Sequence, residues 1–188
     1  TDVDTSLTTN MSDLFRDDKA LSTLDVSKLD TSNVKNLSYV FYNCSSLKTI
    51  DLSNFNTSKA TTLAYLFYGC SLLSAIDVSK FDTSNTTDIG AMFYNCSNLT
   101  TLDLSNFNTS SVTKMYSMFS DCKKLQTQIN IMNAGTTSYS GMFNGALTDP
   151  SAYVILGYTT DTQSIAEAMR NTCTDATAKA RIELKKID

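Results

Sequence analysis

The sequence of 188 residues contains no histidine and no tryptophan, and its one proline is Pro150. Without histidine, the chain cannot form a Ser-His or Cys-His nucleophile pair or a histidine-ligated metal site. It contains no run of about 18 apolar residues, which excludes a membrane-spanning helix. With a net charge of −4, the chain lacks the basic surface that nucleic-acid binding requires.

The start of the chain carries neither methionine nor a signal-type apolar segment. We therefore expect a mature piece of a protein whose targeting or anchoring segments lie outside this sequence. A chain of 188 residues is expected to form one domain and to bury a substantial core.

What the sequence does contain is a repeat of 26 residues. Three residue types mark it: the leucines Leu21, Leu47, Leu73, Leu99 and Leu125; the phenylalanines Phe15, Phe41, Phe67, Phe93 and Phe119; and the cysteines Cys44, Cys70, Cys96 and Cys122. A fixed period of this length is typical of stacked supersecondary units, each of which cannot bury its apolar face alone.

Within each unit the spacing of the apolar residues changes once, from every second residue to helical spacing, as the unit that begins at Leu99 shows. In "LTTLDLSNF", apolar and polar residues alternate, which predicts a short strand. The following "NTS" consists of residue types that cap helix N-termini. Beyond it, Val112, Met115, Met118 and Phe119 recur at helical spacing, which predicts a helix of about three turns.

Stacking such units predicts an α/β fold, a right-handed solenoid of the leucine-rich-repeat type with a parallel sheet on one face and short helices on the other. We predict a solenoid over 1–146, with a half-unit at 1–20, full units from 21, 47, 73 and 99, and an irregular unit from 125. Residues 147–188 read as a degenerate repeat that caps the C-terminal end, with strand-like "AYVILGY" and helix-like "TQSIAEAMRNTC".

The segment "LTTLDLSNFNTSSVTKMYSMFSDC" and its copies resemble the 26-residue repeat of BspA-like leucine-rich-repeat proteins. The resemblance covers about residues 1–146, and the tail "YVILGYTTDTQSIAEAM" is similar to the usual ending of that family. The resemblance implies a secreted or surface-anchored bacterial protein. Some members of the family are adhesins, and the resemblance supplies no catalytic residues.

One aspartate stands between two aliphatic residues in every full unit, which predicts an exposed aspartate column on the open face of the sheet: Asp25, Asp51, Asp77 and Asp103. Neighbouring carboxylates at strand spacing repel by roughly 1 kcal/mol per pair in water, so we expect each to raise the pKa of the next. Two interpretations are open. Either hydrogen bonds hold each carboxylate, for example from the parallel serine row (Ser27, Ser53, Ser79 and Ser105), or the column faces a ligand or cation.

Five tyrosines recur in two registers that the predicted helices direct away from the core: Tyr39 and Tyr65 in one, and Tyr42, Tyr68 and Tyr94 in the other. Such an exposed group presents apolar rings with hydroxyl tips, a composition common in protein and sugar contacts. The same rings could equally pack along one another and shield the joints between units.

The cysteines show no metal-ligand spacing, because neighbouring members of the column are 26 residues apart. At the ends of adjacent helices their backbones would lie about 8–10 Å apart, beyond the roughly 7 Å limit for a disulfide. We therefore expect free thiols that serve as small core residues. We expect no metal and no cofactor, and the pattern does not place Cys173.

The sequence therefore predicts a non-catalytic recognition or adhesion module that is secreted or displayed on a bacterial surface. Its expected partner is a protein or glycan of a host or a neighbouring cell, and we expect the chain to be a monomer. The alternative is a structural spacer or assembly element of a larger surface protein. An adhesin is expected to carry an exposed patch unlike the rest of its surface, whereas a spacer is expected to be uniformly polar.

Overall fold

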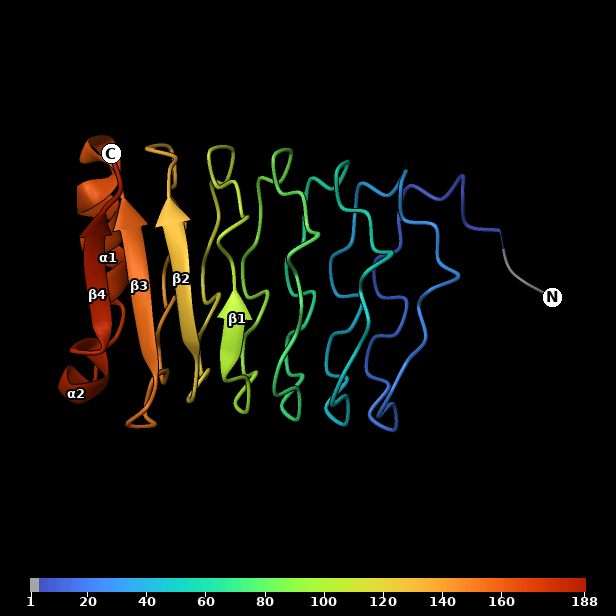
Figure 1. Ribbon diagram of the computed structural model, residues 1–188, viewed down its shortest axis with the longest axis horizontal. Coiled ribbons are helices and arrows are strands. Elements are labelled where there is room, and N and C mark those ends of the chain that lie inside the picture. The colour runs from blue at the N-terminus through green and yellow to red at the C-terminus, as the bar shows by residue number, and fades with distance from the viewer. Residues whose placement is uncertain (1–3) are drawn as a thin grey trace.

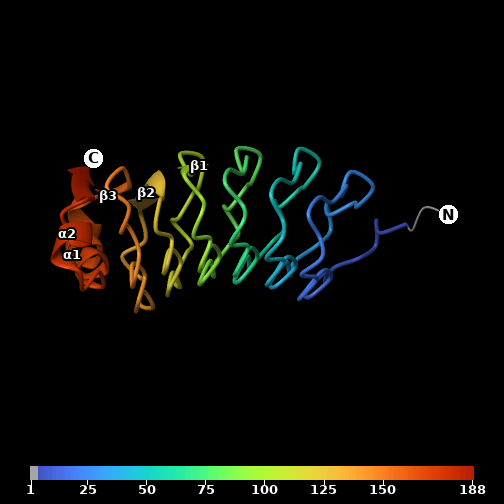
Figure 2. The same ribbon diagram turned by 90° about the horizontal axis from the view of Figure 1, so that it is seen from below.

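The repeated units lie side by side as successive turns of the backbone in the computed structural model, which describes residues 4–188 (Figure 1). The view turned by 90° shows the same single row of turns, with the helical segments gathered at the C-terminal end (Figure 2). Residues 1–3 of the predicted half-unit lie outside the described residues.

The regular elements form a parallel α/β arrangement. Four parallel strands make one open sheet in the order β1 (Thr101–Asp103), β2 (Gln126–Ile131), β3 (Tyr153–Tyr158) and β4 (Ile182–Lys186). The helices are the 3₁₀-helix η1 (Thr160–Thr162) and the α-helices α1 (Gln163–Asn171) and α2 (Ala176–Lys179). Of the strands predicted in the four full units, one is formed in part, as β1, and the preceding unit adds a single bridge from Ala75 to Thr101.

The helices predicted inside the repeated units are wrong, because residues 4–159 contain no α-helix. Each of these segments is instead a pair of tight turns. In one unit the turns place Tyr39 and Asn43 at φ 63° and 56°, and in the next Tyr65 and Gly69 at φ 60° and 73°. Two left-handed residues four positions apart prevent a right-handed helix from continuing through each segment.

The backbone groups that a helix would pair internally are paired between units instead. The N–H groups of Tyr39 and Phe41 donate to the carbonyls of Ala64 and Leu66 at 3.1 and 3.0 Å. A line of parallel bridges on this side of the stack runs through Asn10, Asn36, Thr62, Asp88, Lys114 and Ser138. Each turn of the chain therefore depends on its neighbour for hydrogen bonds.

A buried threonine in the predicted helix cap also joins neighbouring units. Thr57 is 1% exposed, and its hydroxyl donates to the carbonyl of Asp82 at 2.9 Å while accepting from the Asp82 N–H at 2.8 Å. The equivalent hydroxyls each donate to a backbone carbonyl of the next unit, and together they form the threonine column: Thr31, Thr57, Thr83 and Thr109. The helix-cap interpretation of this motif is therefore wrong, because its threonine bonds across units.

The core is a continuous row of aromatic rings, the phenylalanine column: Phe15, Phe41, Phe67, Phe93, Phe119 and Phe143. Neighbouring rings lie 5.3–6.3 Å apart and within 19° of parallel. Phe143 keeps its place although it follows Phe119 by 24 residues rather than 26. All but Phe15 are fully buried, so the column gives the stack one uninterrupted core.

The C-terminal segment contains the strand and the helix that its sequence predicts. "AYVILGY" forms β3, and α1 buries Ala166 and Met169. Strand β4 pairs with β3 in parallel and ends the sheet with Lys185 and Lys186 in its last positions. The boundary at residue 147 stays a prediction.

We expect Phe67→Ala to destabilise the protein more than Phe15→Ala. Phe67 stacks on a ring on each side, whereas Phe15 is half-buried and stacks on Phe41 alone. Truncating the inner ring is expected to cost about 3–5 kcal/mol, as other buried Phe truncations do. The free energies of unfolding from urea melts measure both losses, and equal losses would contradict a stack of interdependent units.

The threonine column provides a second stability test. We expect Thr57→Val to cost about 1–3 kcal/mol, because the change leaves two part-buried backbone groups of Asp82 without their partner while preserving side-chain shape. Thr61→Val is the matched control, since this exposed hydroxyl makes one bond, to the Lys35 carbonyl at 3.2 Å. Similar losses in urea melts for the two variants would show that the buried hydroxyl does not join the units.

Candidate functional site

The aspartate column is exposed, as the sequence predicts. In the third full unit, Ile76 and Val78 are 8% and 1% exposed, whereas Asp77 between them faces solvent. The same alternation orients Asp103 outward from β1, between the buried Leu102 and Leu104. The carboxylates therefore form a row across the outer face of the strand side of the stack.

Hydrogen bonds within each turn hold these carboxylates. The serine two residues on donates its backbone N–H to the Oδ1 atom of each aspartate at 2.8–2.9 Å, from Ser27 to Asp25, Ser53 to Asp51, Ser79 to Asp77 and Ser105 to Asp103. This geometry is the hydrogen-bonded arrangement that the sequence left open as one of two interpretations, and it leaves the ligand-facing interpretation a prediction.

The expectation that like charge raises the pKa values of the aspartate column is wrong. Hydrogen bonds from the serine two residues on lower the pKa of all four aspartates. The serine hydroxyl has the larger effect on Asp25 and Asp77, and the serine backbone N–H has the larger effect on Asp51 and Asp103. The neighbouring carboxylates do raise the pKa of Asp51, but this is a smaller effect. Charge repulsion at strand spacing in water is weak enough for local hydrogen bonds to outweigh it.

The predicted tyrosines lie together in the structure, half-buried rather than fully exposed. Tyr39 stacks on Tyr65 with ring centroids 4.5 Å apart, and Tyr68 stacks on Tyr42 and Tyr94 at 4.5 and 4.4 Å. Burial raises the pKa of Tyr68 to about 12. Both sequence interpretations are therefore compatible, because the rings pack along one another and still present an edge to solvent.

A sixth tyrosine, Tyr116, joins this group, and the sequence interpretation missed it because it falls one position out of register. Its ring centroid lies 6.0 Å from that of Tyr65, two units away along the chain. Gly90 makes this possible, because a Cβ atom at that position would lie 2.3 Å from the Tyr116 ring. The signal in the sequence is the pair Gly90 and Ala91, which leaves the intervening unit without large side chains here. We call the six residues the tyrosine surface: Tyr39, Tyr42, Tyr65, Tyr68, Tyr94 and Tyr116.

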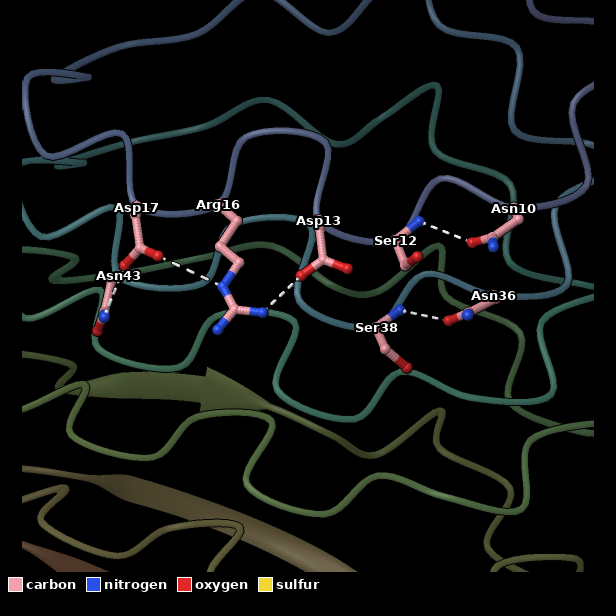
Figure 3. A network of polar contacts seen from close by, with 8 residues as sticks. All are labelled: Asn10, Ser12, Asp13, Arg16, Asp17, Asn36, Ser38 and Asn43. Carbon is pink, nitrogen blue, oxygen red and sulfur yellow. Dashed lines mark hydrogen bonds and ion pairs between the residues drawn. The ribbon is translucent and has the colours of Figure 1, made fainter.

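The N-terminal end of the tyrosine surface carries an arginine held between two carboxylates (Figure 3). The guanidinium carbon of Arg16 lies 4.7 Å from the ring centroid of Tyr42 and 5.3 Å from that of Tyr39. Its Nη1 and Nε atoms contact Asp13 and Asp17 at 2.8 and 3.3 Å. The surface is thus aromatic in the middle and charged at one end.

The four cysteines of the column are free and buried, as predicted, and Cys173, which the sequence pattern does not place, is free and buried as well. Each thiol of the column donates to the carbonyl of a phenylalanine in the preceding unit, for example Cys70 to Phe41 at 3.2 Å and Cys122 to Phe93 at 2.9 Å. Burial raises the pKa of Cys44 to about 11 and that of Cys122 to about 12. These are core thiols with no nucleophilic character at neutral pH.

Residues 4–188 contain no group of three or more Cys, Asp or Glu side chains arranged to hold a metal ion. Within the same residues, no helix has the length and apolar character needed to cross a membrane. Ligand binding by the aspartate column and by the five predicted tyrosines stays a prediction.

We expect Asp77→Asn to lower the thermal stability at neutral pH. Because the folded pKa of Asp77 lies below its usual value, its charge contributes stability above the unfolded pKa, and this contribution is lost as pH falls through the folded pKa. Asparagine keeps the serine contact, as Asn56 does with Ser58, so the variant isolates the effect of charge.

The measurement is the melting temperature of wild type and Asp77→Asn from neutral pH to about pH 2, where the two curves are expected to meet. Asp161→Asn removes the same charge outside the aspartate column and controls for net charge. A variant more stable than wild type at neutral pH would mean that charge repulsion dominates the column after all.

Comparison with known proteins places the chain in a family by sequence. The family model described as "Mycoplasma protein of unknown function, DUF285" matches residues 1–76 and 61–181. No curated protein and no solved structure matches the chain. Since the two matches together span nearly the whole sequence, the chain belongs to the DUF285 family of proteins of unknown function.

Proposed function

We propose that this protein is a non-catalytic recognition or adhesion module that is secreted or displayed on a bacterial surface and binds a protein or a glycan. The observation that carries the proposal is the tyrosine surface, six contacting aromatic rings from four neighbouring units. Tyrosines with an apolar body and a polar tip are enriched in binding sites. Apart from individual large apolar residues such as Leu7, Leu14 and Tyr153, most of the other exposed residues are serine, threonine, asparagine or charged residues.

We further propose that the stack is a right-handed solenoid of the leucine-rich-repeat type, in the manner of the BspA-like proteins that the repeat resembles. The parallel sheet and the pairing of each unit with the next support this proposal. The helices of that architecture are replaced here by tight turns in the repeated units. The surface location and the absence of catalysis rest on the resemblance and on the lack of histidine.

The experiment is a binding screen of the purified chain against arrays of glycans and extracellular-matrix proteins. We expect at least one retained ligand, and we expect the double variant Tyr42→Ala/Tyr94→Ala to weaken its binding about tenfold or more, as loss of aromatic anchors does. Tyr158→Ala, which changes a partly buried tyrosine at the end of β3, is the matched control and should bind as wild type does.

Thermal melts of each variant separate lost binding from lost folding. A screen that retains no ligand would favour the alternative, a structural spacer of a larger surface protein. An equal loss for the double variant and the Tyr158 control would mean that the tyrosine surface is not the contact site.

A further inference from the structure

A continuous trough runs across the strands on the outer face of the sheet, on a surface separate from the tyrosine surface. Four shallow hollows make it up, and each shares residues with the next. Thr49 and Ile50 belong to the first and second, Thr101 and Asp103 to the second and third, and Tyr153 and Ile155 to the third and fourth. We call this surface the trough.

The first half of the trough is acidic. The aspartate column lines it from Asp25 to Asp103, and short side chains, such as Thr49, Ala75 and Thr101, lie beside the carboxylates. None of these four carboxylates forms an ion pair with a lysine or arginine within residues 4–188. Lys28 and Lys80 lie near enough to lower the pKa of Asp25 and Asp77, whereas the equivalent positions beside Asp51 and Asp103 are Asn54 and Asn106.

The second half of the trough has uncharged polar residues first, then an aromatic residue, and charged residues again at its far end. Gln126 and Gln128 of β2 continue the two outward columns, and β3 follows with Tyr153 and Ile155. The Tyr153 side chain is 47% exposed, which makes it one of the few large apolar groups open to solvent. The trough therefore passes from a row of carboxylates to Tyr153 and Ile155, and it ends beside Arg181 and Glu183.

We infer that the trough binds an extended basic segment of a partner protein, which lies across the strands with its lysines or arginines against the aspartate column and an apolar side chain on Tyr153. The inference rests on the proposed recognition function and names the chemistry of one partner. Charge complementarity selects a basic segment, because the exposed carboxylates have no cation of their own in contact. The open sheet face supplies the space, and Tyr153 supplies a place for an apolar anchor.

The strand spacing sets the length of the segment. At about 4.8 Å between strands, four aspartates span about 14 Å, which is four to five residues of extended chain at about 3.3 Å each. Strand β3 lies two strands beyond β1, a further distance of about 10 Å or three residues. The fitting segment has basic residues at alternate positions over about five residues and an apolar residue about three positions beyond.

The probes are two fluorescein-labelled peptides, Lys-Ser-Lys-Ser-Lys-Ser-Ser-Leu and its reversed sequence, which cover both chain directions. A third peptide replaces the lysines with glutamates. Fluorescence anisotropy of wild type is expected to show saturable binding of at least one lysine peptide and none of the glutamate peptide. Binding is expected to weaken as salt rises from about 50 mM to about 300 mM, because shorter screening lengths reduce exposed charge attraction.

Two pairs of substitutions separate a defined trough from general charge attraction. Asp51→Asn/Asp77→Asn removes two trough charges, keeps the serine contacts, and is expected to weaken binding about tenfold or more. Asp18→Asn/Asp161→Asn makes the same change in net charge at exposed positions that do not line the trough, and should bind as wild type does. Tyr153→Ser is expected to weaken the leucine peptide but not the same peptide ending in serine.

No binding of either lysine peptide to wild type, or equal losses for the two aspartate pairs, would overturn the inference. The screen described above keeps the two proposals apart. A retained array ligand together with unbound peptides would refute the trough inference and leave the recognition function standing. Bound peptides together with an empty array would support the trough and remove the tyrosine surface as a site.

Discussion

The hydrogen bonds between neighbouring units are the constraint on which the rest of this structure depends. A helical repeat satisfies most of its backbone groups internally, whereas these units consist of tight turns that cannot do so. The N–H of Phe41 must therefore reach the carbonyl of Leu66, and the hydroxyl of Thr57 must reach the backbone of Asp82. Buried backbone groups without partners are costly, so a unit is stable only beside another unit of the same shape.

This dependence also determines what the surface looks like. Because every unit must match the next, any residue type that recurs in the sequence becomes a column in space. The phenylalanine column fills the core, while the aspartate column and the tyrosine surface lie outside it. Binding on such a surface is expected to use rows of equivalent side chains rather than one asymmetric cluster, which is a reason to look for extended partners.

The incorrect helix prediction has a specific physical cause. Leu37, Val40, Phe41 and Cys44 are all fully buried, at positions i, i+3, i+4 and i+7. An amphipathic helix produces this spacing, but so does a pair of tight turns with left-handed residues at Tyr39 and Asn43. The apolar pattern reports which side chains face inward and contains no information on which carbonyl accepts each N–H. Sequence therefore predicted the buried positions of this segment correctly and its backbone incorrectly.

The sequence by itself determined the 26-residue period, the inward and outward positions of each unit, the free state of the cysteines, and the strand and helix of the C-terminal segment. Each of these follows from residue type and spacing along one chain. Only the tertiary structure decided that Thr57 joins two units, that Tyr116 reaches Tyr65 across Gly90, and that the pKa values of the aspartate column are lowered. These properties depend on distances between atoms of different turns, or on hydrogen-bond geometry within a turn, and neither is encoded in a repeat pattern.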